Sequence, residues 1–379
     1  METDEIIREF LNKGVQLDTK VLEFFNKNPQ KIQEFSTKID GVELPVVIDM
    51  DFVNKNLQED IELRIIKQPS INKKISTEEF IRRINKRYEN IKGMFENKVE
   101  LGNIISINKI RDKVVQFSLM GMVKEKNGNK VLLEDQTGEV SVTLENSEDL
   151  LEDDVVGVVC KREDNVIIGK KILFPDIPIN REINRTKKEI NCLLSDVGLG
   201  EDVEEKISKI LNHIKETSYK NLFIFIFGVV PINDKVKNFF SDLNKYSKKI
   251  LITSDINVPD LFRLNLPAMI QIENAKIMLI NSEDIKKYFR RWPDSSINDV
   301  FLRLLKRRHM DPIIDAKDNR SEDVFLLDSI PDLVICHGLG PEIFNYKGTT
   351  VICTGNVMTE PIYWLINLKT REIIKVELP

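Results

Sequence analysis

The fold is decided by a stretch that reads SINDVFLRLLKRRH over 296–309, VFLL over 324–327, PDLVICHG over 331–338 and TVICTGN over 350–356. The first segment has the apolar spacing of a helix. The three that follow are short apolar runs bounded by glycine, proline or polar turn residues, which is typical of buried strands. The stretch therefore predicts a sheet whose strands deliver loops, and functional side chains, to one edge.

Composition limits the class of protein. A chain of 379 residues that is 41% hydrophobic and 31% charged can bury a sizeable core and form two or three globular domains. Its 56 basic and 61 acidic residues give a net charge of -5, so no overall field attracts nucleic acid or a membrane surface. The longest apolar run, 222–231, is about half the length of a membrane span.

The cysteines and the N-terminal residues indicate the cellular compartment of the protein. Four widely spaced cysteines are present: Cys160, Cys192, Cys336 and Cys353. Three of them lie in apolar runs. This usage favours reduced thiols over a disulfide framework or a zinc site. The first residues lack the basic start and apolar run of a signal peptide. We therefore expect a cytoplasmic protein.

The N-terminal third divides into three segments. Apolar residues at helical spacing predict a small helical module over 1–40, with Asp18 as a helix cap. Either this module is only a local fold, or it docks another protein. Residues 41–75 are less regular and are predicted to be a linker with one possible strand at 45–48. A helix over 76–100 then leads into the next domain.

That helix begins at a capping box formed by Ser76 and Glu79. Its apolar stripe faces a core, and its other faces carry a run of basic residues: Arg82, Arg83, Lys86 and Arg87. Such a run indicates a solvated surface more often than a phosphate contact. We expect the solvated surface.

The spacing of apolar residues changes over residues 101–178. Strands are predicted over 114–123, 130–134, 139–144, 154–161 and 165–173, with turn residues between them. Five strands in this length suit a small barrel such as the OB-fold. OB-folds that bind single strands stack bases on aromatic side chains. Here the aromatics are Phe117 and Phe174, so we expect a barrel that packs and contacts partners, with Phe117 as the possible nucleic-acid contact.

The rest of the chain, 179–379, is predicted to be an α/β domain. Prolines in the FPDIP segment over 174–178 stiffen its start. Strands at 222–227, 249–253 and 275–280 alternate with helices at 202–215, 234–246 and 296–308, which is typical of helices layered on a sheet. Together the three parts predict an α+β multidomain protein.

A colinear set of segments resembles one family. The set comprises EF at 79–80 with RY at 87–88, LMGMV at 119–123, LEDQTG at 133–138, DVVGV at 154–158, FPDIP at 174–178, LLKRRH at 304–309 and IPD at 330–332. In this order they resemble the small subunit of archaeal D-family DNA polymerase. The resemblance implies an N-terminal helical domain, an OB-fold and a calcineurin-like phosphodiesterase domain, shared with the non-catalytic B-subunits of eukaryotic replicative polymerases.

In active members the resemblance implies a two-metal 3′-5′ exonuclease. Its ligands lie in the patterns Asp-x-His, Gly-Asp-x-x-Asp, Gly-Asn-His-Asp, a lone His before Gly, and Gly-His-x-His. We place these patterns on degenerate positions: Gly228 and Val230 after the 222–227 strand, taken as the first, then Asp255, Asn281, His337 and Gly340. Two metals need about six or seven protein ligands. We therefore predict no metal, no cofactor and no catalytic residue.

The sequence thus favours a non-catalytic accessory subunit in an archaeal DNA replication complex. The resemblance implies a heterodimer with a polymerase large subunit, contact with DNA through that complex, and other replication factors at the N-terminal helices. Arg307, Arg308 and His309 are expected to serve the partner interface or the fold. Two alternatives stay open: a residual metal-dependent exonuclease that depends on Asp255, and a single-strand-binding protein that depends on Phe117.

Overall fold

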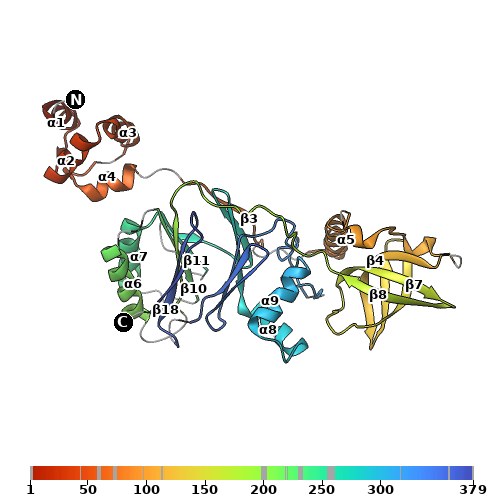
Figure 1. Ribbon diagram of the computed structural model, residues 1–379. Helices are drawn as coiled ribbons and strands as arrows, with labels where there is room; N and C mark the ends of the chain where they lie inside the picture. The colour runs from red at the N-terminus through yellow and green to blue at the C-terminus, as the bar shows by residue number, and fades with distance from the viewer. Residues whose placement is uncertain are drawn as a thin grey trace.

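The computed structural model describes residues 3–42, 44–57, 61–70, 75–96, 98–111, 114–197, 203–217, 219, 221–228, 234–253, 261–315, 317–356 and 359–377. Figure 1 shows N-terminal helices at one end, two facing sheets in the middle and a barrel at the other end. The chain is therefore a mixed α/β multidomain protein. No helix in the described ranges is long and apolar enough to cross a bilayer.

The N-terminal module is larger than the sequence predicted. It contains α1 (Thr3–Asn12), β1 (Gln16–Leu17), α2 (Thr19–Lys27), α3 (Gln30–Lys38), β2 (Val47–Ile48) and α4 (Met50–Leu57). Phe10, Phe25 and Phe35 form its core, and Ile48 and Val53 complete that core. The linker predicted over 41–75 is therefore wrong, because three short helices do not enclose these rings without β2 and α4.

The second half of the predicted linker also has a structural role. Residues Leu63–Lys67 form β3, which pairs antiparallel with β13 (Ala268–Ile272) at the edge of a sheet. The barrel, whose strands lie between these two segments in the sequence, is thus an insertion into the sheet domain.

Two six-stranded sheets form the central domain. The order in the first is β12 (Leu261–Arg263), β11 (Lys249–Ile252), β10 (Leu222–Phe227), β9 (Asn191–Asp196), β18 (Ile362–Asn367) and β19 (Ile373–Glu377). The order in the second is β16 (Glu342–Tyr346), β17 (Thr349–Cys353), β15 (Leu333–His337), β14 (Ala275–Asn281), β13 and β3. Alternate residues of both sheets, such as Phe225 and Ile335, bury a common core between them.

Helices cover the outer faces of the two sheets. α6 (Val203–Thr217) and α7 (Asp234–Tyr246) pack on the first sheet through residues such as Ile214 and Phe240. α8 (Ser282–Arg291) and α9 (Ile297–Lys306) pack on the second through Ile285 and Leu304. The result is a four-layer arrangement of helices, sheet, sheet and helices, visible in Figure 1.

The predicted five strands between residues 114 and 173 close into a barrel. They are β4 (Gln116–Asn127), β5 (Lys130–Asp135), β6 (Gly138–Leu144), β7 (Val155–Glu163) and β8 (Val166–Leu173), in the order β4-β5-β6-β8-β7. Short helices η1 (Val99–Leu101) and η2 (Ile107–Lys109) precede them. Gly169 permits close packing inside the barrel, because a Cβ there would lie 2.5 Å from Leu144. α5 (Thr77–Gly93) begins at the predicted capping box and lies between barrel and sheets.

One predicted strand is wrong. Residues 324–327 are buried, but they form a turn with a single bridge between Leu326 and His309. Their carbonyl groups are taken by other partners: Phe325 accepts from the Met310 amide, and Leu327 accepts from the Arg308 side chain. The apolar run therefore fills the core under α9 without joining a ladder.

Candidate functional site

The sheet domain contains a strand before 222–227 that the sequence did not predict. β9 precedes β10 and ends on Asp196, which is buried. The strand at 222–227 is therefore the second, and Gly228 does not mark the end of the first. Asp196 is the functional candidate that the sequence analysis missed. Its signal was the run Cys192-Leu193-Leu194 followed by Ser-Asp at the start of the domain.

Asp196 and His337 meet at the rim where the two sheets face each other. The Asp196 Oδ2 atom lies 3.6 Å from His337 Nδ1, and it accepts a 2.9 Å hydrogen bond from the Gly338 amide. The Phe227 ring stacks on the His337 imidazole, with 5.3 Å between ring centroids and 12° between planes. His337 is therefore held by a carboxylate on one side and an aromatic face on the other.

The other predicted rim positions offer less. Asn281 is the register partner of His337, but its Oδ1 accepts from the Glu283 amide at 3.0 Å and caps α8. Gly338 has a φ of +82°, and a Cβ there would lie 2.5 Å from Ser282 Oγ. Gly340 has open space where a side chain would begin. Val230 and Asp255 lie outside the described residues.

The described part of the rim offers few metal ligands. Asp196, Asn281 and His337 supply the donor atoms just described, and Asn281 already uses its oxygen as a cap. Within the ranges that the structure describes, no group of three or more His, Cys, Asp or Glu side chains is arranged to hold a metal. Two bridged divalent cations need about six or seven protein ligands. The donors that the described residues place at this rim do not fit such a pair.

Arg307 joins the sheet domain to the barrel. Its Nε atom lies 2.8 Å and 3.1 Å from the two Asp154 oxygens, and its Nη2 donates to the Asp149 carbonyl. The guanidinium also lies over the rings of Phe174 and Trp292, at 4.5 Å and 5.1 Å. Arg307 is 3% exposed, so its side chain is used for contacts within this chain.

Arg308 and His309 are buried as well. Arg308, at a φ of +54°, donates to the Leu327 carbonyl and so fixes the turn that replaced the predicted strand. The Nδ1 atom of His309 accepts the Asp311 amide hydrogen at 3.0 Å, and its Nε2 lies 2.9 Å from Asp323. An imidazole with Nδ1 as acceptor is neutral, and burial lowers the pKa of His309 accordingly. These contacts lie within the chain.

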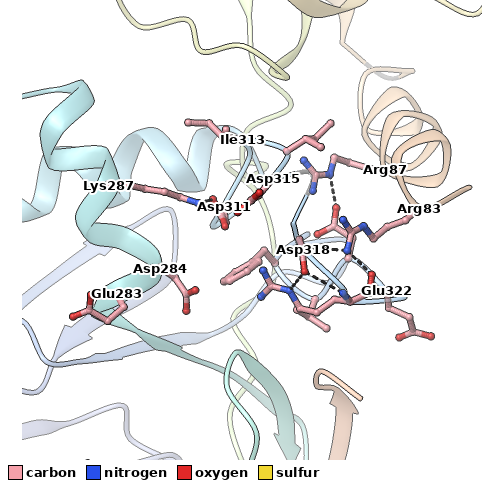
Figure 2. A pocket seen from close by; sticks show the side chains of 15 residues that line it. Arg83, Arg87, Glu283, Asp284, Lys287, Asp311, Ile313, Asp315, Asp318 and Glu322 are labelled. Carbon is pink, nitrogen blue, oxygen red and sulfur yellow. Dashed lines mark hydrogen bonds and ion pairs between the residues drawn. The ribbon is translucent and has the colours of Figure 1, made fainter. Parts of the chain in front are cut away.

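A polar cavity of about 160 Å³ lies between α5, α8 and the segment 311–325. Figure 2 shows the side chains that line it. Arg83 pairs with Asp318 at 3.0 Å, and Arg87 pairs with Asp323 and donates to the Pro312 carbonyl at 2.6 Å. Burial alone would raise the pKa of Asp323, but His309 and Arg87 hold it well below its usual range.

The expected solvated face of α5 is therefore only half correct. Arg83 and Arg87 are 5% and 6% exposed, because acidic partners from residues 318–323 lie against them. Arg82 and Lys86 are exposed as expected. The buried pair ties α5 to the sheet domain.

Asp284 lines the same cavity, and burial raises its pKa to about 6. Because the folded state holds the proton more tightly than the unfolded state, ionisation of Asp284 destabilises the fold as pH rises from about 4 to about 6. We expect Asp284→Asn to raise the free energy of unfolding by about 1–2 kcal/mol at pH 7.5 and to have little effect at pH 4. Urea unfolding at the two pH values measures this.

Glu283→Gln is the matched control, since Glu283 is the exposed neighbour on α8. We expect Glu283→Gln to change the free energy of unfolding by the same small amount at both pH values. A stability gain for Asp284→Asn that does not change with pH would contradict the assignment.

The barrel does not expose Phe117 on its surface. Phe117 is 4% exposed and belongs to the barrel core, so its prediction as a nucleic-acid contact is wrong. A β-strand places alternate side chains inside a barrel, and Phe117 is one of these. Three barrel lysines are paired with barrel glutamates: Lys124 with Glu139, Lys161 with Glu163, and Lys170 with Glu145.

Comparisons with known proteins give a consistent relationship. No family model matches the chain. The DNA polymerase II small subunit of Archaeoglobus fulgidus is 26% identical over 69% of this chain and 66% of its own length. The corresponding subunit of Methanothermobacter thermautotrophicus is 21% identical over 80% of this chain and 78% of its own length.

The small subunit of Thermoplasma acidophilum is 21% identical over 96% of this chain and 88% of its own length. Among solved structures, a Thermus thermophilus protein is 10% identical with a TM-score of 0.29, covering 51% of this chain and 100% of that one. The chain spans about two thirds of the length of the Archaeoglobus subunit. The resemblance seen in the sequence is thus confirmed: over most of its length, this chain is similar to the DNA polymerase II small subunits of these three archaea.

Proposed function

We propose that this chain is a non-catalytic accessory subunit of a D-family-like DNA polymerase in DNA replication. It would join a large catalytic subunit in a heterodimer and reach DNA through that complex. The observation that carries the proposal is similarity to three archaeal small subunits that extends over 69–96% of the chain. The N-terminal module, whose core is self-contained, would dock other replication factors.

The proposal includes the identity of the two larger domains. The barrel order β4-β5-β6-β8-β7, with β6 and β8 parallel, supports an OB-fold, which is a five-stranded Greek-key barrel. Two facing sheets covered by helices support a calcineurin-like phosphodiesterase domain that has lost its metal ligands. Arg307 would hold these two domains as one platform for the large subunit.

The direct test is co-expression with the large subunit of the same genome. We expect the two chains to copurify through affinity and size-exclusion steps as a heterodimer. Separate elution of two folded chains at all salt concentrations would overturn the proposal.

A residual exonuclease is the second candidate, supported by the Asp196 and His337 pair at the rim. We expect purified protein with manganese to release no nucleotides from a 3′-labelled strand above background, because the described rim residues do not fit two metals. Asp196→Ala and Asp255→Ala should leave that background unchanged. Manganese-dependent release abolished by either substitution would favour the nuclease.

A free-standing single-strand binder is disfavoured. Phe117 is buried, and the three lysines named above are neutralised by neighbouring glutamates. Such a protein needs exposed aromatics beside unpaired cations.

A further inference from the structure

A groove runs along the outer face of the first sheet, between α6 and β19. Tyr363 and Leu365 of β18 form its floor, and Ile374 and Val376 of β19 form one wall. These residues alternate along their strands, so they share one face. Ile374 is 48% exposed, which leaves this wall uncovered. The groove contains two hollows of about 300 Å³ and 180 Å³.

The rim of this groove carries a surplus of negative charge. Four exposed glutamates line it: Glu189, Glu216, Glu372 and Glu377. Within the described ranges, no ion pair neutralises any of them. Lys209 is the cation among the lining residues, and it pairs with Glu205 at 3.3 Å. We call this feature the glutamate groove.

These features indicate which chemical class of partner would bind in the groove. Unpaired glutamates repel nucleic acid and anionic lipid. They are not gathered closely enough to hold a metal, since the described residues contain no such group. An apolar floor with carboxylates at the rim complements a segment that has an apolar face flanked by lysine or arginine.

We propose that the glutamate groove binds a lysine- or arginine-rich amphipathic segment of the polymerase large subunit. The apolar side chains of the segment contact Leu365 and Ile374, and its cations face the glutamates. This inference rests on the proposed function and adds a location for the contact between the two chains.

The test measures the affinity of the purified large subunit for the full chain by biolayer interferometry. Glu372→Lys with Glu377→Lys should weaken binding about tenfold or more at moderate salt, because two attractions become repulsions. The wild-type affinity should fall with salt more steeply than that of this variant. Glu342→Lys with Glu360→Lys, two exposed glutamates elsewhere in the domain, makes the same charge change and should leave the affinity within about twofold.

The outcomes are distinguishable. If the wild type binds the large subunit and the groove variant binds it equally well, the groove inference is wrong and the proposed function stands. An equal loss in the Glu342 and Glu360 control would indicate a net-charge effect and would also overturn the groove. If the wild type does not bind the large subunit, the proposed function fails, and the assigned occupant fails with it.

Discussion

Arg307→Ala is expected to lower the free energy of unfolding by about 3–5 kcal/mol, because it leaves the buried Asp154 carboxylate without its partner. Asp154 is 2% exposed, and both of its oxygens contact Arg307 Nε. The loss should also loosen the barrel from the sheet domain, since these two residues belong to different domains. Urea unfolding measures the first effect, and limited proteolysis between the domains measures the second.

Arg303→Ala is the matched control on the same helix. Arg303 pairs with Asp149 at 3.3 Å, but its side chain is 29% exposed and that of Asp149 is 57% exposed. Such a pair contributes about 0–1 kcal/mol. A double replacement, Arg307→Met with Asp154→Leu, should be less destabilised than Arg307→Ala. Equal stability of Arg307→Ala and wild type would show that the pair does not hold the domains together.

Asp332→Ala is expected to cost a comparable amount, about 3–5 kcal/mol, because it removes a buried carboxylate that satisfies several donors. Asp332 is 0% exposed and accepts hydrogen bonds from the Lys276 amide at 2.9 Å and from the Asn184 amide at 3.2 Å. It also faces Arg181 at 3.3 Å. The segment around 181–184 should detach from the sheet and become cleavable by protease.

Asp328→Ala tests whether the loss of stability depends on burial of the carboxylate or only on its charge. Asp328 pairs with Lys67 at 2.9 Å, but its side chain is 53% exposed. We expect it to lower the free energy of unfolding by less than about 1 kcal/mol. If both aspartate variants lost the same stability, burial would not explain the Asp332 effect.

The barrel was the most predictable part of the fold. Strands with a period of two and turn residues such as Asn127-Gly128 depend on local sequence, and all five strands were found near their predicted positions. The helix at 297–306 also depends on local sequence, since its apolar spacing predicts it, and the structure adds a capping box at Ser296 and Asp299.

What could not be predicted depended on distant partners. The burial of Arg83 and Arg87 requires acids more than 200 residues further along the chain. The apolar run at 324–327 has the pattern of a strand. Its carbonyl groups instead accept hydrogen bonds from the Arg308 side chain and from the Met310 amide. At the rim, Asp196 was missed because β9 follows a polar segment, and one missed strand shifted the ligand pattern that came next.

Strand β3 has a consequence for how the protein is made. Its partner, β13, ends at Ile272, so a ribosome must add about two hundred residues after β3 before the edge can pair. At typical rates of synthesis this takes about 10–40 s. The barrel can fold during that interval, while β3 stays unpaired, because every other strand of its sheet comes later in the sequence. A gene shortened to start at the barrel would produce a protein without β3. The edge of β13 would then stay unpaired, and we expect this protein to aggregate.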